Sequence, residues 1–174
     1  MAVLPIVTAP AEVLSQRARE VRDDEFGPAL EQLLSDMAET MYAAPGVGLA
    51  APQVGDGRRV VVIDPGEREG SEPQLFRMVN PTIVERSKET LVYPETCLSV
   101  PDLEVKVTRN KRVLVRWRLG DGTPRERWFE EFEAVVVQHE LDHLQGTVLL
   151  DRVSGFRRRR YMAKRKKDTR VPAK

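Results

Sequence analysis

The sequence predicts an α+β fold, with antiparallel sheets packed around a central helix, an amphipathic helix towards the N-terminus and a basic helix at the C-terminus. Three observations support this prediction: two segments carry apolar residues at helical spacing, short strand-like segments lie between them, and basic residues gather at the C-terminus. The 174 residues contain no internal repeat and no linker long enough to divide domains. We expect one domain over residues 1–153 and a basic tail, able to form a helix, over 154–174.

The first helix is predicted over Glu25–Ala44, because its apolar residues recur every three or four positions. These residues are Leu30, Leu33, Leu34, Met37 and Met41. The helix should end at Pro45-Gly46-Val47-Gly48, where a proline ring and two glycines favour a tight turn.

Short strands separated by turn-forming residues follow the first helix, and their short links favour antiparallel pairing. We predict them at Arg59–Asp64, Leu75–Val79, Thr82–Glu85, Val105–Val107, Arg112–Leu119 and Arg125–Phe129. A second helix is predicted over Glu130–Gln145, with Gly146 as its stop. The segment Phe156–Lys167 reads as a basic helix with too few apolar residues to dock firmly.

Composition and charge indicate a globular protein with an uneven charge distribution. Hydrophobic residues make up 41% and charged residues 32% of the chain, and no apolar run approaches the ~18–20 residues that cross a bilayer. Met1–Pro10 carries no positive charge, and the single cysteine, Cys97, fits a reducing compartment, so we expect a cytoplasmic protein. Residues 152–174 hold 11 Lys and Arg against one acid, Asp168. Such a tail suggests an anionic partner such as nucleic acid, and the alternative is a solvated basic end.

The motif His139-Glu140-Leu141-Asp142-His143 is H-E-x-x-H, and it falls on the apolar face of the second predicted helix. Residues four apart on a helix lie one above the other, so two imidazoles can hold one metal ion. Glu140 then approaches the metal without being its natural third ligand, which suits a general base. The alternative, two ordinary helix-face histidines, is weakened because these are the only histidines in the chain.

The third ligand cannot be a histidine, and Cys97 is the obvious candidate. It lies in the segment Tyr93–Pro101, which is bounded by prolines and reads as a loop able to present a thiolate to a helix. A Cys/His/His set leaves one position open for water, as catalytic sites require. An inert buried cysteine is the alternative. The ligand set admits iron, cobalt, nickel or zinc and does not name the metal.

A further motif, Gly46-Val47-Gly48-Leu49-Ala50-Ala51-Pro52-Gln53, combines glycines that permit close backbone approach with an amide donor. Alone it could equally be a helix-ending turn. Together, the three segments resemble the peptide deformylase family, whose signatures are G-x-G-L-A-A-x-Q, E-G-C-L-S and Q-H-E-x-D-H in this order. The likeness covers nearly all of residues 1–153. The departure is Thr96, where the family has glycine and where a β-branched side chain restricts the backbone and narrows the substrate channel.

The resemblance implies a metal-dependent hydrolase that removes the formyl group from formylmethionine on newly synthesised polypeptides, with ferrous iron as the usual metal. Zinc, nickel or cobalt could replace iron in purified protein. Glu140 would act as general base and acid. The Leu98 backbone N–H and the Gln53 side chain would stabilise the oxyanion.

The resemblance also implies a substrate site. Val47, Gly48 and Val136 would contact the methionine residue, with Phe132, Val135 and Leu98 nearby, although each apolar side chain could be plain core. Arg109 matches an arginine near the substrate in relatives, and an exposed strand-end arginine is the alternative.

Two other functions compete with this prediction. A metalloprotease would use the same H-E-x-x-H chemistry, but its usual downstream His or Glu ligand motif is absent. A catalytically impaired binding module would use the basic tail on RNA. For the enzyme itself, we expect residues 156–170 to contact ribosomal RNA, and we expect no membrane partner.

Overall fold

The computed structural model describes residues 2–66 and 74–168, and all strand pairing within the sheets is antiparallel. A five-stranded sheet has the order β1-β2-β3-β6-β7, and a separate hairpin pairs β4 with β5. The sheet comprises β1 (Gly48–Ala50), β2 (Val60–Ile63), β3 (Phe76–Arg86), β6 (Arg112–Arg118) and β7 (Pro124–Glu130). The hairpin comprises β4 (Thr90–Cys97) and β5 (Val100–Asn110). The predicted α+β fold is confirmed.

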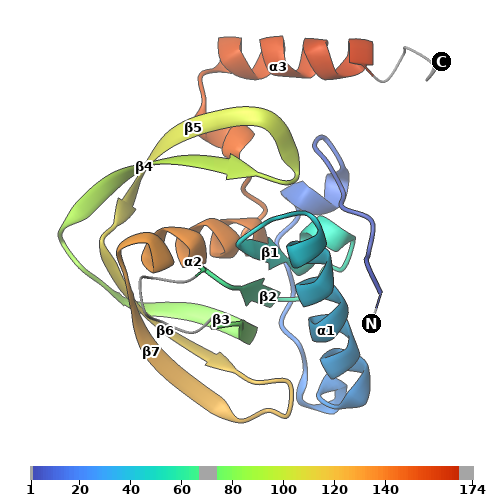
Figure 1. The fold of residues 1–174 in the computed structure, drawn as a ribbon, viewed down its shortest axis with the longest axis vertical. Coiled ribbons are helices and arrows are strands. Elements are labelled where there is room, and N and C mark those ends of the chain that lie inside the picture. Colours follow the sequence, from blue (N-terminus) through green and yellow to red (C-terminus); the bar gives the residue numbers. More distant parts are fainter. Residues whose placement is uncertain (1, 67–73, 169–174) are drawn as a thin grey trace.

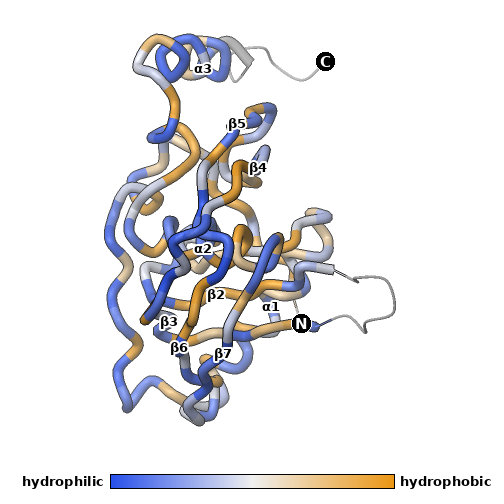
Figure 2. Tube along the Cα trace, turned by 90° about the vertical axis from the view of Figure 1, so that its left-hand side faces the viewer, coloured by the Kyte–Doolittle hydropathy of each residue, from blue (hydrophilic) through white to orange (hydrophobic). Residues whose placement is uncertain are grey.

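Helix α2 (Glu131–Leu144) lies between the five-stranded sheet and the β4–β5 hairpin, as Figure 1 shows. One of its faces packs into a core with β2, β3, β6 and β7, where Phe129 and Met78 are completely buried. Strand β2, which reads Val-Val-Val-Ile, is buried along its whole length and is hydrophobic in Figure 2. Helix α2 is therefore held on both sides, which fixes the direction of its side chains.

Helix α1 (Pro28–Ala43) covers the other face of β1 and β2 (Figure 1). Four of the five predicted stripe residues are fully buried, and Leu33 is partly buried. The helix begins three residues later than predicted, because Gly27 adopts φ 139° and Pro28 fills the first helical position, where its missing N–H costs nothing. Asp23–Glu25 form a short 3-10 turn before it.

The predicted strands Leu75–Val79 and Thr82–Glu85 are one strand, β3, so the break between them was wrong. Asn80, with φ 52°, and Pro81 suggested a turn, but they form an irregularity inside the strand. The Asn80 side chain accepts from the Val21 N–H and donates to the Val21 carbonyl, at 2.9 Å in each case. This contact with a distant segment stabilises a conformation that strands rarely contain.

The prediction of a loop around Cys97 was also wrong. Most of Tyr93–Pro101 belongs to the β4–β5 hairpin, and β5 is far longer than the predicted Val105–Val107. Residues of β5 alternate between buried and exposed, as expected for a strand with one solvated face. Gly48, the last residue of the predicted turn Pro45–Gly48, is instead the first residue of the short edge strand β1, Gly48–Ala50.

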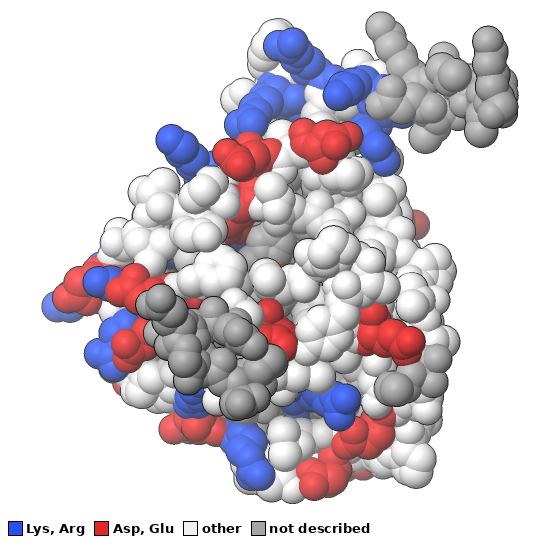
Figure 3. Space-filling model, in the orientation of Figure 1, with Lys and Arg blue, Asp and Glu red and all other residues white. Residues whose placement is uncertain are grey.

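Helix α3 (Gly155–Asp168) agrees closely with the predicted basic helix and lies beside β5 in Figure 1, with Tyr161 buried in the same cluster as residues of β5. Its contact with the hairpin includes the Tyr161 hydroxyl, which donates to the Pro101 carbonyl at 2.9 Å, and Arg157, which donates to the Glu104 carbonyl at 2.7 Å. Phe156 is 70% exposed. Lysines and arginines gather over this helix in Figure 3. None of the helices in the described residues has the length and apolar character to cross a membrane.

Candidate metal centre

Cys97, His139 and His143 come together between the hairpin and α2. The helix places the two imidazoles on one face with ring centroids 5.1 Å apart, and Cys97 reaches them from the end of β4. Cys97 Sγ lies 3.3 Å from His143 Nε2. One donor atom from each of the three residues falls within 4.8 Å of the others.

The chemistry of these three residues fits a divalent metal ion. Burial, followed by the charges of His139 and Arg109, lowers the pKa of His143 well below its ordinary value, so this imidazole is neutral as a ligand must be. Burial opposes the charged form of His139, but contacts with Cys97 and Glu95 outweigh burial and raise its pKa to about 10. The same surroundings that favour a second proton on His139 would favour a metal cation in place of that proton. A thiolate with two imidazoles suits iron, zinc, nickel or cobalt.

A buried ion-pair network holds His139 on the side of its ring that faces Glu95. Glu95 accepts two hydrogen bonds from Arg109, at 2.7 and 2.8 Å, and its Oε2 lies 2.8 Å from His139 Nδ1. Arg109 also donates to Asp142 at 2.8 Å, and Asp142 in turn accepts from Arg152. Burial disfavours the charged form of Glu95, but Arg109 and His139 outweigh it and lower its pKa to about 2. Glu95 is therefore ionised and fixes the orientation of the His139 ring.

Glu140 points into the space beside the three ligands, and its position depends on Gly48. A Cβ atom at Gly48 would lie 2.8 Å from Glu140 Cδ, so only glycine leaves room for this carboxylate. Glu140 Oε2 is buried and has no hydrogen-bond partner in the described part of the chain. Burial raises the pKa of Glu140 to about 7. An unpartnered carboxylate of this kind suits proton transfer near neutral pH.

Gln53 is buried and fixed by three contacts. Its Oε1 accepts from the Ala50 N–H at 2.8 Å, and its Nε2 donates to Ser99 Oγ at 3.2 Å and approaches Cys97 Sγ at 3.7 Å. The short 3-10 segment Ala51–Val54 after β1 holds the side chain in this direction. The amide donor therefore lies beside the metal ligands.

A cavity of about 530 Å³ opens onto this cluster. Its walls include Cys97, His139, Glu140, Gln53 and Leu98, with the apolar residues Val47, Phe132, Val135 and Val136 and with Gly48. Arg109 is neither an exposed strand-end residue nor part of this wall, because it is buried in the ion-pair network behind His139.

Thr96 also lines the cavity, and it lies within β4 at the irregularity between Glu95 and Cys97, where the register with β5 shifts. β-branched side chains are common in strands.

Sequence reasoning missed Glu95, which holds both Arg109 and His139. The loop predicted for this segment gave no reason to pair Glu95 with Cys97. In a strand, residues two apart share a face, and both residues are buried while Thr96 between them is exposed. A strand prediction for residues 90–97 would have placed Glu95 beside the metal ligand.

Comparison with known proteins agrees with this geometry. The family model for polypeptide deformylase matches residues 3–159. A peptide deformylase from Chromobacterium violaceum is 47% identical over 167 residues, which are 96% of this chain and 96% of that protein.

Two solved structures are similar over most of the chain. A peptide deformylase from Ehrlichia chaffeensis in complex with actinonin has a TM-score of 0.90 and 38% identity, covering 98% of this chain and all of that chain. The class I type b enzyme from Acinetobacter baumannii, with Met-Ala-Ser bound, has a TM-score of 0.80 and 37% identity, covering 87% and 99% of the two chains. With its Cys/His/His cluster, its fold and these relatives, the chain belongs to the polypeptide deformylase family.

Proposed function

We propose that this enzyme removes the formyl group from the N-terminal formylmethionine of newly synthesised polypeptides. The observation that carries this proposal is the Cys97, His139 and His143 cluster at a cavity whose other wall is apolar, with the unpartnered carboxylate of Glu140 beside it. The catalytic domain is residues 1–153, and residues 154–174 form the basic tail. Met-Ala-Ser, found in the Acinetobacter enzyme, has the form of a deformylated product.

Cys97, His139 and His143 would hold the metal, and we propose ferrous iron, with zinc, nickel or cobalt able to occupy the same ligands in purified protein. A bound divalent ion supplies Lewis acidity, which lowers the pKa of a coordinated water from about 16 towards ~7. Glu95 keeps the His139 ring in place while the reaction proceeds. Arg109 supports Glu95 from outside the cavity and is a positioning residue rather than a substrate contact.

Glu140 moves the proton during hydrolysis. The water oxygen bonds to the formyl carbon, and Glu140 Oε2 takes the proton that the water loses. When the bond between the formyl carbon and the methionine nitrogen breaks, Glu140 returns this proton to the leaving amine. Formate and a free amino terminus are the products. The burial of Glu140 supports this role, because a carboxylate with a pKa of about 7 can both accept and release a proton at neutral pH.

Gln53 Nε2 and the Leu98 backbone N–H stabilise the negative oxygen that develops on the formyl group. Gln53 is already fixed by Ala50 and Ser99, so little reorganisation is needed when charge develops. Val47, Leu98 and Val136 receive the methionine side chain, together with Phe132 and Val135. Gly48 gives the substrate backbone close access as well as making room for Glu140.

The basic tail suits a cytoplasmic enzyme that meets its substrate at the ribosome. Helix α3 packs on the hairpin through Tyr161 and Met162, and most of its arginines and lysines are exposed to solvent (Figure 3). We propose that this helix contacts ribosomal RNA. Cosedimentation with ribosomes should fall steeply with salt and should weaken when Arg159 and Arg160 are changed to Gln. Unchanged cosedimentation of this variant would contradict the proposal.

The test of the function is formate release from formyl-Met-Ala-Ser by anaerobically iron-loaded protein, compared with acetyl-Met-Ala-Ser. We expect formyl-selective turnover that is lost in Glu140→Gln, by about 10²–10⁴-fold. The matched control is Glu131→Gln, an exposed change in the first turn of the same helix. Cleavage of internal peptide bonds would favour a metalloprotease, and bound metal without formate release would favour a binding module.

A further inference from the structure

Two adjoining hollows lie on the side of α2 that faces away from the metal cavity. They have volumes of about 380 and 460 Å³ and share three residues, Arg59, Thr82 and Gln145. Arg86 lines the first hollow, and Arg17 lines the second. We call the two hollows together the arginine groove. Arg109, which positions His139 through Glu95, also lines the first hollow, but none of the described residues that line the groove also lines the metal cavity.

Arg59, at the centre of the arginine groove, is 8% exposed. Its Nη2 donates to the Pro81 carbonyl at 2.6 Å, which occupies one of the five N–H donors of a guanidinium. No carboxylate in the described part of the chain forms an ion pair with it. Burial lowers its pKa, and Arg17 lowers it further, while the charge of Glu20 acts in the opposite direction. A buried arginine without an ion-pair partner is uncommon, because burying a charge is costly unless it is paired.

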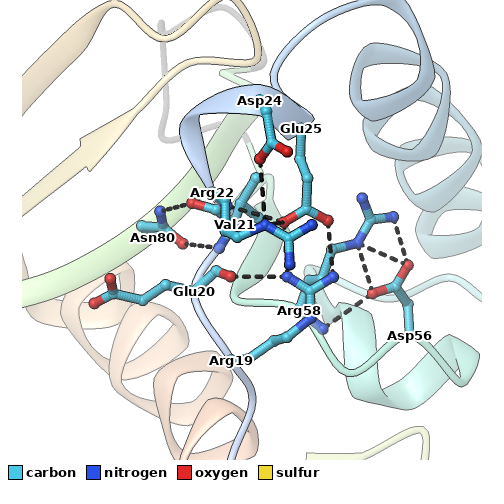
Figure 4. Close-up of polar contacts among 9 residues, drawn as sticks. All are labelled: Arg19, Glu20, Val21, Arg22, Asp24, Glu25, Asp56, Arg58 and Asn80. Atoms are coloured by element: carbon cyan, nitrogen blue, oxygen red, sulfur yellow. Dashed lines mark hydrogen bonds and ion pairs between the residues drawn. The ribbon is translucent and has the colours of Figure 1, made fainter.

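Other arginines in and beside the groove are paired with carboxylates, and Arg19, which lines the second hollow, is one of them. Figure 4 shows Arg19 paired with Glu25 and Arg58 paired with Asp56, at 2.7 and 2.6 Å. Arg22 is likewise paired with Asp24. Each of these three arginines is therefore neutralised by a carboxylate close to it in the sequence.

Arg109 and Arg152 of the first hollow are also paired, both with Asp142, and the other three arginines of the groove differ from them. Across residues 2–66 and 74–168, no ion pair joins Arg17, Arg59 or Arg86 to a carboxylate. The acids that face the groove are Glu20 and Asp142, and Asp142 is already bound to Arg109 and Arg152. The groove therefore carries excess positive charge.

We infer that the arginine groove binds a phosphate group. Guanidinium groups match the oxygens of phosphate with two parallel hydrogen bonds, and they are preferred where such anions are recognised. Thr82 and Gln145 add neutral polar groups at the part shared by both hollows. The phosphate could be a free ion or a group on an RNA backbone, because both present the same oxygens. An anion there would relieve the repulsion between Arg17 and Arg59.

The first test is calorimetric titration of the full chain with inorganic pyrophosphate at constant ionic strength. The double variant Arg17→Gln, Arg86→Gln changes only exposed residues, so its fold is not at risk. We expect it to bind pyrophosphate about tenfold more weakly, as for the loss of a charged hydrogen bond. Arg59→Gln should weaken binding at least as much. The matched control Arg125→Gln removes an exposed arginine of β7 outside the groove and should bind as the unchanged protein does.

The second test uses a fluorescent uridine decamer, whose binding is followed by anisotropy in the same variants. Weaker binding of both probes by the double variant supports a phosphate site open to either source. Weaker binding of the decamer alone supports an RNA backbone, and weaker binding of pyrophosphate alone supports a free ion. Equal binding of both probes by the unchanged protein and the double variant would overturn the inference, whatever the deformylase activity.

Discussion

Glu95 Oε2 lies 2.8 Å from Nδ1 of His139, so a carboxylate outside the metal cluster determines how one of its ligands is presented. A carboxylate only accepts hydrogen bonds, so Nδ1 carries a proton, and a metal ion bound at Nε2 would replace the second proton of the ring. Arg109 holds Glu95 by two further bonds, which prevents the carboxylate from turning away.

Changing Glu95 to Gln should therefore weaken metal binding by about 10–100-fold, the usual effect of losing such a partner. Competition with a chromophoric chelator would measure this affinity. Glu104→Gln, an exposed change on the neighbouring strand β5, is the control and should bind metal normally. Normal affinity in Glu95→Gln would show that His139 is oriented by the packing of α2 alone.

The substitution Gly48→Ala should impair proton transfer by Glu140 without changing metal binding. The new Cβ would displace the Glu140 carboxylate, because it would lie 2.8 Å from Cδ. We expect kcat to fall by about 10²-fold or more while metal content stays the same. Gly57→Ala is a suitable control, since a Cβ there meets nothing within 4 Å. Full activity in Gly48→Ala would contradict the role given to Glu140.

The pair Arg19 and Glu25 should show a defined acid dependence. A hydrogen bond from Arg19, followed by one from the Arg22 N–H, lowers the pKa of Glu25 to about 2. A lowered carboxyl pKa stabilises the folded state above the ordinary value near 4.5, and this contribution disappears as pH falls towards 2. In Arg19→Gln, the Glu25 titration followed by carboxyl NMR should move upward. A titration that stays near pH 2 would assign the shift to the backbone instead.

Two phenylalanines, one in the core and one at the start of α3, should differ in their contribution to stability because their burial differs. Phe129 is fully buried between the sheet and α2, and Phe156 is 70% exposed. Phe129→Ala should lower the free energy of unfolding by about 3–5 kcal/mol, because it leaves a cavity. Phe156→Ala should change it by less than about 0.5 kcal/mol. Urea denaturation would measure both, and equal effects would be inconsistent with this packing.

The sequence predicts the parts of the site that depend on local periodicity. Spacing four residues apart on a helix brings His139 and His143 together without knowledge of the rest of the fold. Cys97 was predicted as the third ligand and lies within reach of both, although it comes from a strand rather than a loop. The deformylase resemblance rested on the same segments.

The parts that depend on pairing between distant residues could not be predicted in this way. The register of β4 and β5 pairs Glu95 with Val105. Arg109 lies four residues further along β5, on the same face of the strand as Val105, and its long side chain reaches Glu95. Arg109 then reaches Asp142 on α2, 33 residues along the chain. Strand β3 was divided at Asn80 and Pro81 because the bond to Val21 that stabilises this irregularity comes from a segment 59 residues away.

The position of the metal ligands on two different layers has a consequence for folding. Cys97 belongs to the hairpin and the histidines to the helix beneath it, so an ion bound by all three would cross-link two layers that otherwise meet through side-chain packing. Ligand binding to the native state raises apparent stability by RT ln(1 + [L]/Kd). Metal loading and folding are then one linked equilibrium. In a cell that is short of the metal, the protein would lose its activity and also part of the stability with which the hairpin is held to the helix.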